Sequence, residues 1–296
     1  MIINNNMMAQ NAHRQMGINQ TNQQSAMEKL SSGQQINRAG DDAAGLSISE
    51  KMRGQIRGLE QASQNSQDGI SLIQTAEGAL DETHNILQRM RELTVQAGNE
   101  GTNQEEDLEA IQDEIEALVD EIDGISDRTQ FNGKDLLDGD FDEDSDNPLI
   151  FQIGANEDQN LELHIEDMSA DALGTTGDDG ATDIQMDDID VRKFADNSPD
   201  EDNDGFDDQL EAIDAAIQQV SDQRSELGAT QNRLEHTISN LDNAAENLQA
   251  AESRIRDTDM AAEMMEQTQA NILNQASQSM MAQANQEPQN VLQLLQ

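Results

Sequence analysis

The feature that most constrains this chain is a set of three long stretches in which apolar residues recur every three or four positions. The first runs from Ile48 to Leu93, the second from Leu108 to Ile125 and the third from Leu210 to Ile255. This spacing places the apolar residues on one face of an α-helix. Three such helices can bury those faces only against one another. We therefore expect a mainly α fold, a long antiparallel coiled-coil-like helical hairpin or bundle.

The middle of the chain follows a different pattern. Asn132-Gly133 is typical of a tight hairpin turn, and residues 161–166 alternate between apolar and polar side chains. Both features predict a short β-hairpin insert. Residues 174–208 are rich in Asp, Gly, Asn and Thr and offer few apolar anchors, which favours a loop or a marginal outer flap.

The two ends carry weaker helical stripes that amide side chains interrupt. The stripe of residues 1–32 consists of Met8, Ala12, Met16, Asn19, Gln23, Ala26 and Leu30. The stripe of residues 260–296 consists of Met260, Met264, Thr268, Asn271, Gln275, Ser279 and Gln283. Such stripes bury too little apolar area to offset about 1–2 kcal/mol per residue of backbone ordering. Neither end should hold a helix alone, and a polymer would supply the partners that each end needs.

Charge and composition exclude several classes of protein. The formal net charge is −45, and residues 135–210 hold 26 acidic side chains against two basic ones. This charge argues against nucleic acid and anionic membranes as partners and favours a solvated acidic surface suited to high salt. The chain has no Cys, and its four His are scattered singly, so we expect no enzyme. No stretch approaches a membrane span or a standard signal peptide, so secretion would need another route.

Residues at both ends carry a resemblance to a known family. The run LSSGQQINRAGDDAAGL at residues 30–46 is similar to the N-terminal signature of bacterial flagellins. SRIRDTDMAAE at residues 253–263 and ANQEPQNVLQLL at residues 284–295 resemble the C-terminal signature of that family. The similarity covers about the first 137 and the last 90 residues, so the chain resembles a short flagellin without large outer domains.

The resemblance implies a structural subunit, secreted and without a cofactor, that assembles with itself into the flagellar filament. It implies an inner-core helix in residues 1–43 that pairs with residues 257–296. It also implies an outer-tube helical domain in residues 44–256, with a β-rich acidic insert at 130–208. Further partners would be an export chaperone, the type III export apparatus, and the hook–filament junction and cap proteins. Gly124 falls where similar chains usually carry Arg, which suggests local flexibility.

Four positions carry a second implication of the resemblance. In flagellins that animals detect, the matching positions contact the flagellin-sensing Toll-like receptor. These positions are Gln88, Arg89, Leu93 and Glu114. The alternative is that they serve contacts between subunits in the filament.

Residues 200–211 fit the twelve-residue calcium loop of an EF-hand. The candidate ligands are Asp200, Asp202, Asp204, Asp208 and Glu211. The motif lacks a preceding helix, and position eight is Asp207 where an apolar residue is usual. The alternative is an acidic linker whose last residues favour the N-terminus of the next helix through the helix dipole.

Two other functions remain open at this point. A hook–filament junction protein shares the terminal architecture, although the density of signature residues at both ends favours a filament subunit. A coiled-coil signalling module would need a membrane span or a partner-binding tip, and the sequence shows neither.

Overall fold

The computed structural model describes residues 6–99, 103–142, 147–175, 184–195 and 205–294. The helices are α1 (Met7–Ser32), α2 (Ala43–Ala97), α3 (Glu105–Arg128), α4 (Phe206–Arg256) and α5 (Met260–Leu294). The strands are β1 (Gln130–Phe131), β2 (Lys134–Asp135), β3 (Leu149–Gln152), β4 (Asn160–Leu163), β5 (Gly174–Thr175) and β6 (Ile184–Gln185). Two short 3₁₀ helices follow, η1 (Met186–Asp188) and η2 (Val191–Ala195). The prediction of a mainly helical fold with a short β insert is confirmed.

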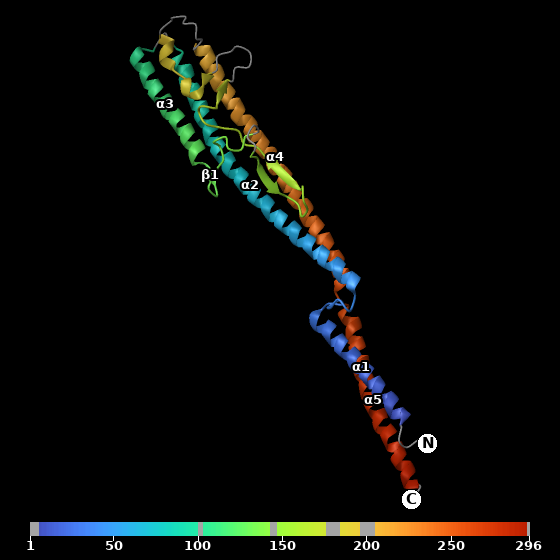
Figure 1. Ribbon diagram of the computed structural model, residues 1–296. Helices are drawn as coiled ribbons and strands as arrows, with labels where there is room; N and C mark the ends of the chain where they lie inside the picture. The colour runs from blue at the N-terminus through green and yellow to red at the C-terminus, as the bar shows by residue number, and fades with distance from the viewer. Residues whose placement is uncertain (1–5, 100–102, 143–146, 176–183, 196–204, 295–296) are drawn as a thin grey trace. The chain divides into compact units, whose positions relative to one another are not determined.

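The chain divides into two compact units. Unit 1 comprises residues 1–57 and 244–296, and unit 2 comprises residues 58–243. Within unit 1, α1 and α5 lie side by side (Figure 1). Within unit 2, the β hairpins lie beside α3, the C-terminal part of α2 and the N-terminal part of α4 (Figure 1). Every member of the main hydrophobic core belongs to unit 2.

The core of unit 2 follows the predicted helical stripes. On α2 the large buried side chains include Ile73, Leu80 and Leu87, which are fully inaccessible to solvent. On α3 the buried positions Leu108, Ile111, Ile115, Val119 and Ile122 are three or four residues apart. On α4 the buried residues Ile213, Val220, Leu227 and Leu234 recur every seven residues, which is two helical turns. Burial of these stripes supplies the apolar stabilisation of unit 2, about 1.5–3 kcal/mol for each large side chain.

Three two-stranded antiparallel hairpins form the insert. In the first, Phe131 pairs with Lys134, so Asn132 and Gly133 make a two-residue turn with positive φ values of 54° and 78°. Asn and Gly are the residues that tolerate this backbone conformation, as the sequence predicted. The second hairpin pairs β3 with β4, and it buries Leu149, Leu161 and Leu163.

The prediction of a poorly anchored loop over residues 174–208 is wrong for the residues described there. Five apolar side chains of this stretch are buried, namely Ile184, Met186, Ile189, Val191 and Phe194. Gln112 of α3 holds the segment by donating to the Ile189 carbonyl and accepting from the Val191 N–H, both at 3.0 Å. These apolar residues were overlooked in the sequence because Asp residues lie between several of them. Their spacing of two and three residues also matches neither a regular strand nor a regular helix.

Candidate functional site

The pair formed by α1 and α5 has a polar interior. Asn19 donates to the Ser277 hydroxyl at 3.2 Å, and Gln23 donates to the Asn271 side-chain oxygen at 2.9 Å. Asn274 in turn donates to Gln23 at 3.2 Å. These partners become earlier in α5 as the chain advances along α1, so the two helices are antiparallel. We call this set of side chains the amide ladder.

Few apolar side chains support the amide ladder. The buried apolar residues of α1 and α5 whose side chains are described are the alanines Ala26, Ala270 and Ala284. Lys29 and Glu263 face each other across the pair at 3.9 Å. Each amide–amide hydrogen bond replaces hydrogen bonds to water, so it adds only about 0.5–1.5 kcal/mol to the free energy of unfolding. The helix pair therefore gains little stability from its own interior.

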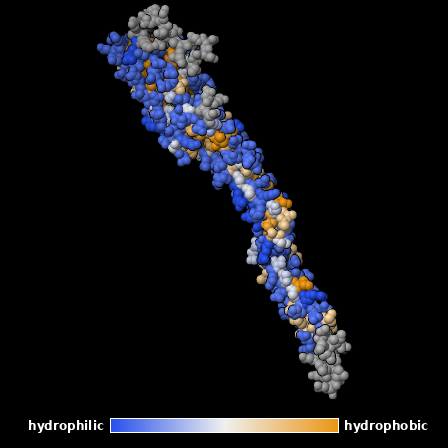
Figure 2. All heavy atoms as spheres, viewed as in Figure 1, coloured by the Kyte–Doolittle hydropathy of each residue, from blue (hydrophilic) through white to orange (hydrophobic). Residues whose placement is uncertain are grey.

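The large apolar side chains of α1 and α5 lie on the outside of the pair, and we call them the outward apolar set. Met265 is 69% exposed and Ile272 is 60% exposed. The full set is Met7, Met8, Ile18, Met27, Met260, Met264, Met265, Ile272, Leu273 and Met280. In the rest of the described chain, the exposed large apolar residues are Ile48, Val95 and Ile150. Figure 2 shows apolar surface in patches over these terminal helices.

Part of the outward apolar set lines a shallow hollow on α5. Its lining residues are Met264, Met265, Thr268, Gln269, Ile272 and Leu273, and its volume is about 550 Å³. Exposed apolar surface of this kind marks sites where another molecule binds. The large apolar side chains of α1 and α5 thus lie in patches on a largely polar exterior, while the interior of the pair is polar.

The stripe predicted for α5 coincides with the inward face only in part, at Asn271, which belongs to the amide ladder. Met260, Met264 and Thr268 are exposed, whereas Glu263 and Ala270 face α1. The predicted stripe advanced from Met260 in steps of three and four residues, and after Met264 these steps lead through amide and hydroxyl side chains. The two terminal stripes therefore left out Ile18, Met27, Met265, Ile272 and Leu273, which belong to the outward apolar set. A second apolar stripe, offset from the amides, was the available signal.

A connector joins α1 to α2 and α4 to α5 within unit 1. The Gln35 N–H donates to the Arg256 carbonyl at 2.7 Å, and the Thr258 N–H donates to the Gly33 carbonyl at 3.1 Å. The Arg256 guanidinium reaches both Gln34 and Glu50 at 3.1 Å. Residues of the N-terminal signature and of the C-terminal signature are thus hydrogen-bonded to each other in this connector.

Asp41 organises the turn of this connector. Its carboxylate accepts the N–H groups of Arg38 and Asn37, and these hydrogen bonds lower the pKa of Asp41 below its ordinary value of 3.8. Because the folded-state pKa is lowered, this stabilisation is present above the unfolded pKa and is lost as the pH falls through the folded one. Asp42 and Asp259 cap the following helices by accepting N–H groups of their first turns.

The four positions that the resemblance linked to a receptor lie on α2 and α3. Arg89 and Glu114 form an ion pair at 2.7 Å, which with Glu92 raises the pKa of Arg89. Gln88 contacts the ring of His84 at 2.8 Å. Leu93 is 2% exposed and belongs to the core of unit 2. Arg89, Glu114 and Gln88 thus lie at the surface, Leu93 does not, and receptor contact stays a prediction.

The proposed calcium loop lies mostly outside the described residues, because Asp200, Asp202 and Asp204 precede residue 205. Asp208 and Glu211 lie in the first two turns of α4, which begins at Phe206. Among the described residues no group of three or more acidic or His side chains is placed to hold a metal ion. Calcium binding stays a prediction, and calorimetric titration of the full chain in sodium chloride would test it.

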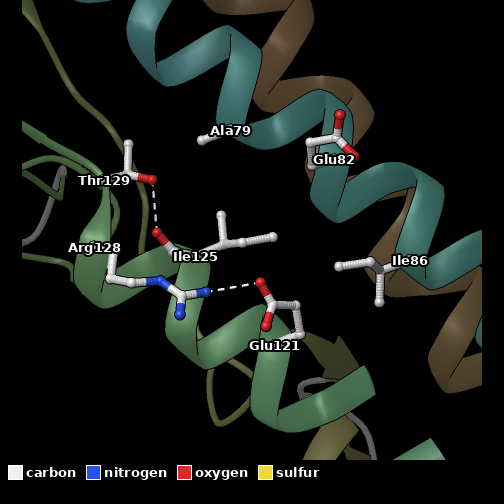
Figure 3. Close-up of a pocket in the computed structure, with 7 residues that line it drawn as sticks. All are labelled: Ala79, Glu82, Ile86, Glu121, Ile125, Arg128 and Thr129. Atoms are coloured by element: carbon white, nitrogen blue, oxygen red, sulfur yellow. Dashed lines mark hydrogen bonds and ion pairs between the residues drawn. The ribbon is translucent and has the colours of Figure 1, made fainter. Parts of the chain in front are cut away.

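A groove of about 450 Å³ lies between α2 and α3 (Figure 3). Its lining residues are Ala79, Glu82 and Ile86 of α2 and Glu121, Ile125, Arg128 and Thr129 at the end of α3. Arg128 folds back to Glu121 at 2.7 Å, and a Cβ at Gly124 would lie 2.8 Å from its guanidinium. A side chain at position 124 would displace only the flexible end of Arg128, and α3 continues through Gly124 to Arg128.

The sparse interior of the α1–α5 pair leads to a prediction for the isolated subunit. A nonspecific protease should first remove residues from about 1–40 and 260–296, and should leave a fragment that contains unit 2. The reason is that three alanines and an amide ladder stabilise the pair, whereas unit 2 has an extensive core. Mass spectrometry of the early cleavage products would check this order. Equal resistance of the ends and of residues 58–243 would contradict it.

Comparisons with known proteins match the full length of the chain. The model of the bacterial flagellin N-terminal helical region matches residues 3–142, and that of the C-terminal helical region matches residues 210–295. The chain is 64% identical to a flagellin of Bacillus subtilis and 59% identical to one of Halalkalibacterium halodurans, with complete coverage of all sequences.

A solved structure shares the fold at low sequence identity. It is a putative flagellar hook-associated protein from Vibrio parahaemolyticus, 16% identical, with a TM-score of 0.59. The match covers 73% of this chain and all of that one. At this identity the likeness concerns the fold alone.

Proposed function

This chain belongs to the bacterial flagellin family, and on that premise we propose that it is a structural subunit that polymerises with itself into the flagellar filament. The observation that carries the proposal is the outward apolar set on α1 and α5. These helices have a polar interior and exposed apolar patches, so packing against the same helices of other subunits would bury the apolar side chains that a single chain leaves exposed. The work of such a subunit is mechanical and requires no catalytic step.

The proposal extends to the route and the partners of assembly. A flagellin of this kind is exported through the flagellar type III apparatus with the help of an export chaperone. It then adds to a filament that grows between junction and cap proteins outside the cell. The weak α1–α5 pair supports this route, because a pair with so little interior burial costs little free energy to open. None of the described helices combines the length and apolarity that a membrane crossing requires.

Reassembly of the purified protein tests the proposal. Purified filaments are dissociated by heat, cooled, and imaged by negative-stain electron microscopy. We expect the single chain to form long filaments of uniform diameter. Short caps that form only on added hook ends would instead indicate a junction protein, and a discrete soluble dimer would indicate a signalling coiled coil. Either result would contradict the proposal.

Assembly should depend strongly on salt. Subunits with a net charge of −45 repel one another, and the Debye length falls from about 10 Å at 0.1 M salt to about 3 Å at 1 M. We expect the critical concentration for polymerisation to fall between these two sodium chloride concentrations. Sedimentation of polymer at each salt concentration measures it. This behaviour would suit a salt-rich habitat.

A variant with two fewer negative charges tests whether charge repulsion causes the salt effect. Asp113 and Asp120 are exposed on α3, and their replacement by Asn removes two negative charges without a change of shape. The double variant should show a shallower dependence on salt than the parent chain. A critical concentration that stays flat or rises with sodium chloride would show that charge repulsion does not limit assembly.

A further inference from the structure

Methionine is distributed unevenly between the two units. Nine of the fourteen methionines lie in α1 and α5. Seven of these are exposed, namely Met7, Met8, Met27, Met260, Met264, Met265 and Met280. In unit 2 the methionines Met90, Met168 and Met186 are all buried, at 0%, 2% and 0% exposure. The exposed thioethers of the described chain therefore all belong to the outward apolar set.

Thioether sulfur reacts with two-electron oxidants in a way that Leu and Ile side chains cannot. A peroxide transfers one oxygen atom to the sulfur lone pair, which gives methionine sulfoxide, and the peroxide is reduced to water or to an alcohol. The product is polar and chiral, and it no longer suits a surface that must pack against apolar neighbours. Solvent exposure decides which methionines react. The methionines of the outward apolar set are therefore accessible to peroxide, whereas those in the core of unit 2 are not.

We propose that the exposed methionines of α1 and α5 form an oxidant-sensitive modification site, at which peroxides convert the free subunit into a form that cannot polymerise. The inference rests on the proposed function, because it assumes that the outward apolar set is covered in the filament. Met264 and Met265 are its centre, since both line the hollow on α5 together with Ile272 and Leu273. Two sulfoxides there would place two polar S=O groups in the apolar contact.

The two states of the protein should differ in sensitivity. In the free subunit Met264 and Met265 are 58% and 69% exposed, so both are open to reagent. In the filament, neighbouring subunits would cover them and slow the reaction. Unit 2 should keep its fold in either state, because its three buried methionines have no route to the oxidant without unfolding.

The experiment treats free subunits and intact filaments with hydrogen peroxide and identifies the oxidised residues by peptide mass spectrometry. In free subunits we expect sulfoxide at the exposed methionines of α1 and α5 before Met90, Met168 or Met186. After removal of the peroxide, the critical concentration for polymerisation should be raised about 10-fold or more. Methionine sulfoxide reductases of both stereospecificities should restore polymerisation.

Two variants separate this site from general damage. Met264→Leu with Met265→Leu keeps this contact surface apolar, and each variant is compared with its own untreated sample. Peroxide should raise the critical concentration of this double variant far less than it raises that of the parent chain. Met168→Leu, which changes a buried methionine of unit 2, should stay as sensitive as the parent chain. Normal polymerisation of the oxidised subunit, failure of the reductases to restore it, or equal sensitivity of both variants would overturn the proposal. Failure of the untreated chain to polymerise would instead overturn the proposed function.

Discussion

Replacement of Ile272 and Leu273 by Gln should abolish polymerisation at concentrations where the parent chain forms filaments. Both side chains are exposed in the free subunit and line the hollow on α5. Loss of their burial removes about 1.5–3 kcal/mol each from the contact between subunits, or roughly 3–6 kcal/mol together. The critical concentration should therefore rise about 100-fold or more. Sedimentation and negative-stain imaging measure the change.

The control for this double variant keeps the surface apolar. Ile272→Met with Leu273→Met alters shape but retains apolar side chains, and Met adapts well to irregular contacts. This variant should polymerise with a critical concentration close to that of the parent. Gln is also a good helix former and adds no charge, so a weakened α5 or extra repulsion would not explain the loss. Filaments formed by the Gln variant at the parent's critical concentration would show that this hollow lies outside the subunit contacts.

Replacement of Leu87 by Ala should destabilise unit 2 by about 2–5 kcal/mol. Leu87 is fully buried in the core shared by α2, α3 and α4, and truncation leaves a cavity that the rigid helices can close only in part. Urea unfolding of the free subunit, followed by circular dichroism, measures the effect on the main cooperative transition.

Leu273→Ala is the matched control, because it makes the same chemical change at a position that is 44% exposed. It should change the stability of unit 2 by less than about 0.5 kcal/mol, and it should weaken polymerisation instead. The two variants thus separate residues that hold the subunit together from residues that hold subunits to one another. Equal destabilisation by both substitutions would contradict this division.

Sequence periodicity predicted the helices of unit 2 well. Leu80, Ile115 and Val220 occupy stripes in which large apolar residues alternate with charged ones, so only one face can be buried. The turn at Asn132-Gly133 was predictable because few residues tolerate its positive φ angles. In these elements the local pattern and the final packing agree.

The inward face of α5 could not be predicted in the same way. The predicted stripe placed Met264 on the inward face and left Asn274 out, whereas Met264 is exposed and Asn274 belongs to the amide ladder. Apolar side chains at helical spacing still mark a surface that favours burial, but in the proposed filament other chains would bury it. The pattern therefore bears on the contacts between subunits more than on the interior of one subunit.

The connector shows another limit of sequence reasoning. The run at residues 30–46 was recognised as a signature, but its physical role is visible only where Gln35 meets the Arg256 carbonyl and Arg256 meets Glu50. These partners are more than 200 residues apart in the chain. No local pattern links them, so the signature indicated the family without indicating the contact.

Because the amide ladder buries few apolar side chains, the stability of unit 1 should depend on the concentration of subunits. When only other copies of the chain cover the apolar surface of a helix pair, its free energy of unfolding rises with the logarithm of subunit concentration. A fold stabilised by a ligand behaves in the same way. Its melting temperature is then set by how many subunits surround it and not by its sequence alone. Dilution would loosen the ends of the chain and leave the core of unit 2 unchanged. Order at the termini would then be a collective property of the assembled subunits.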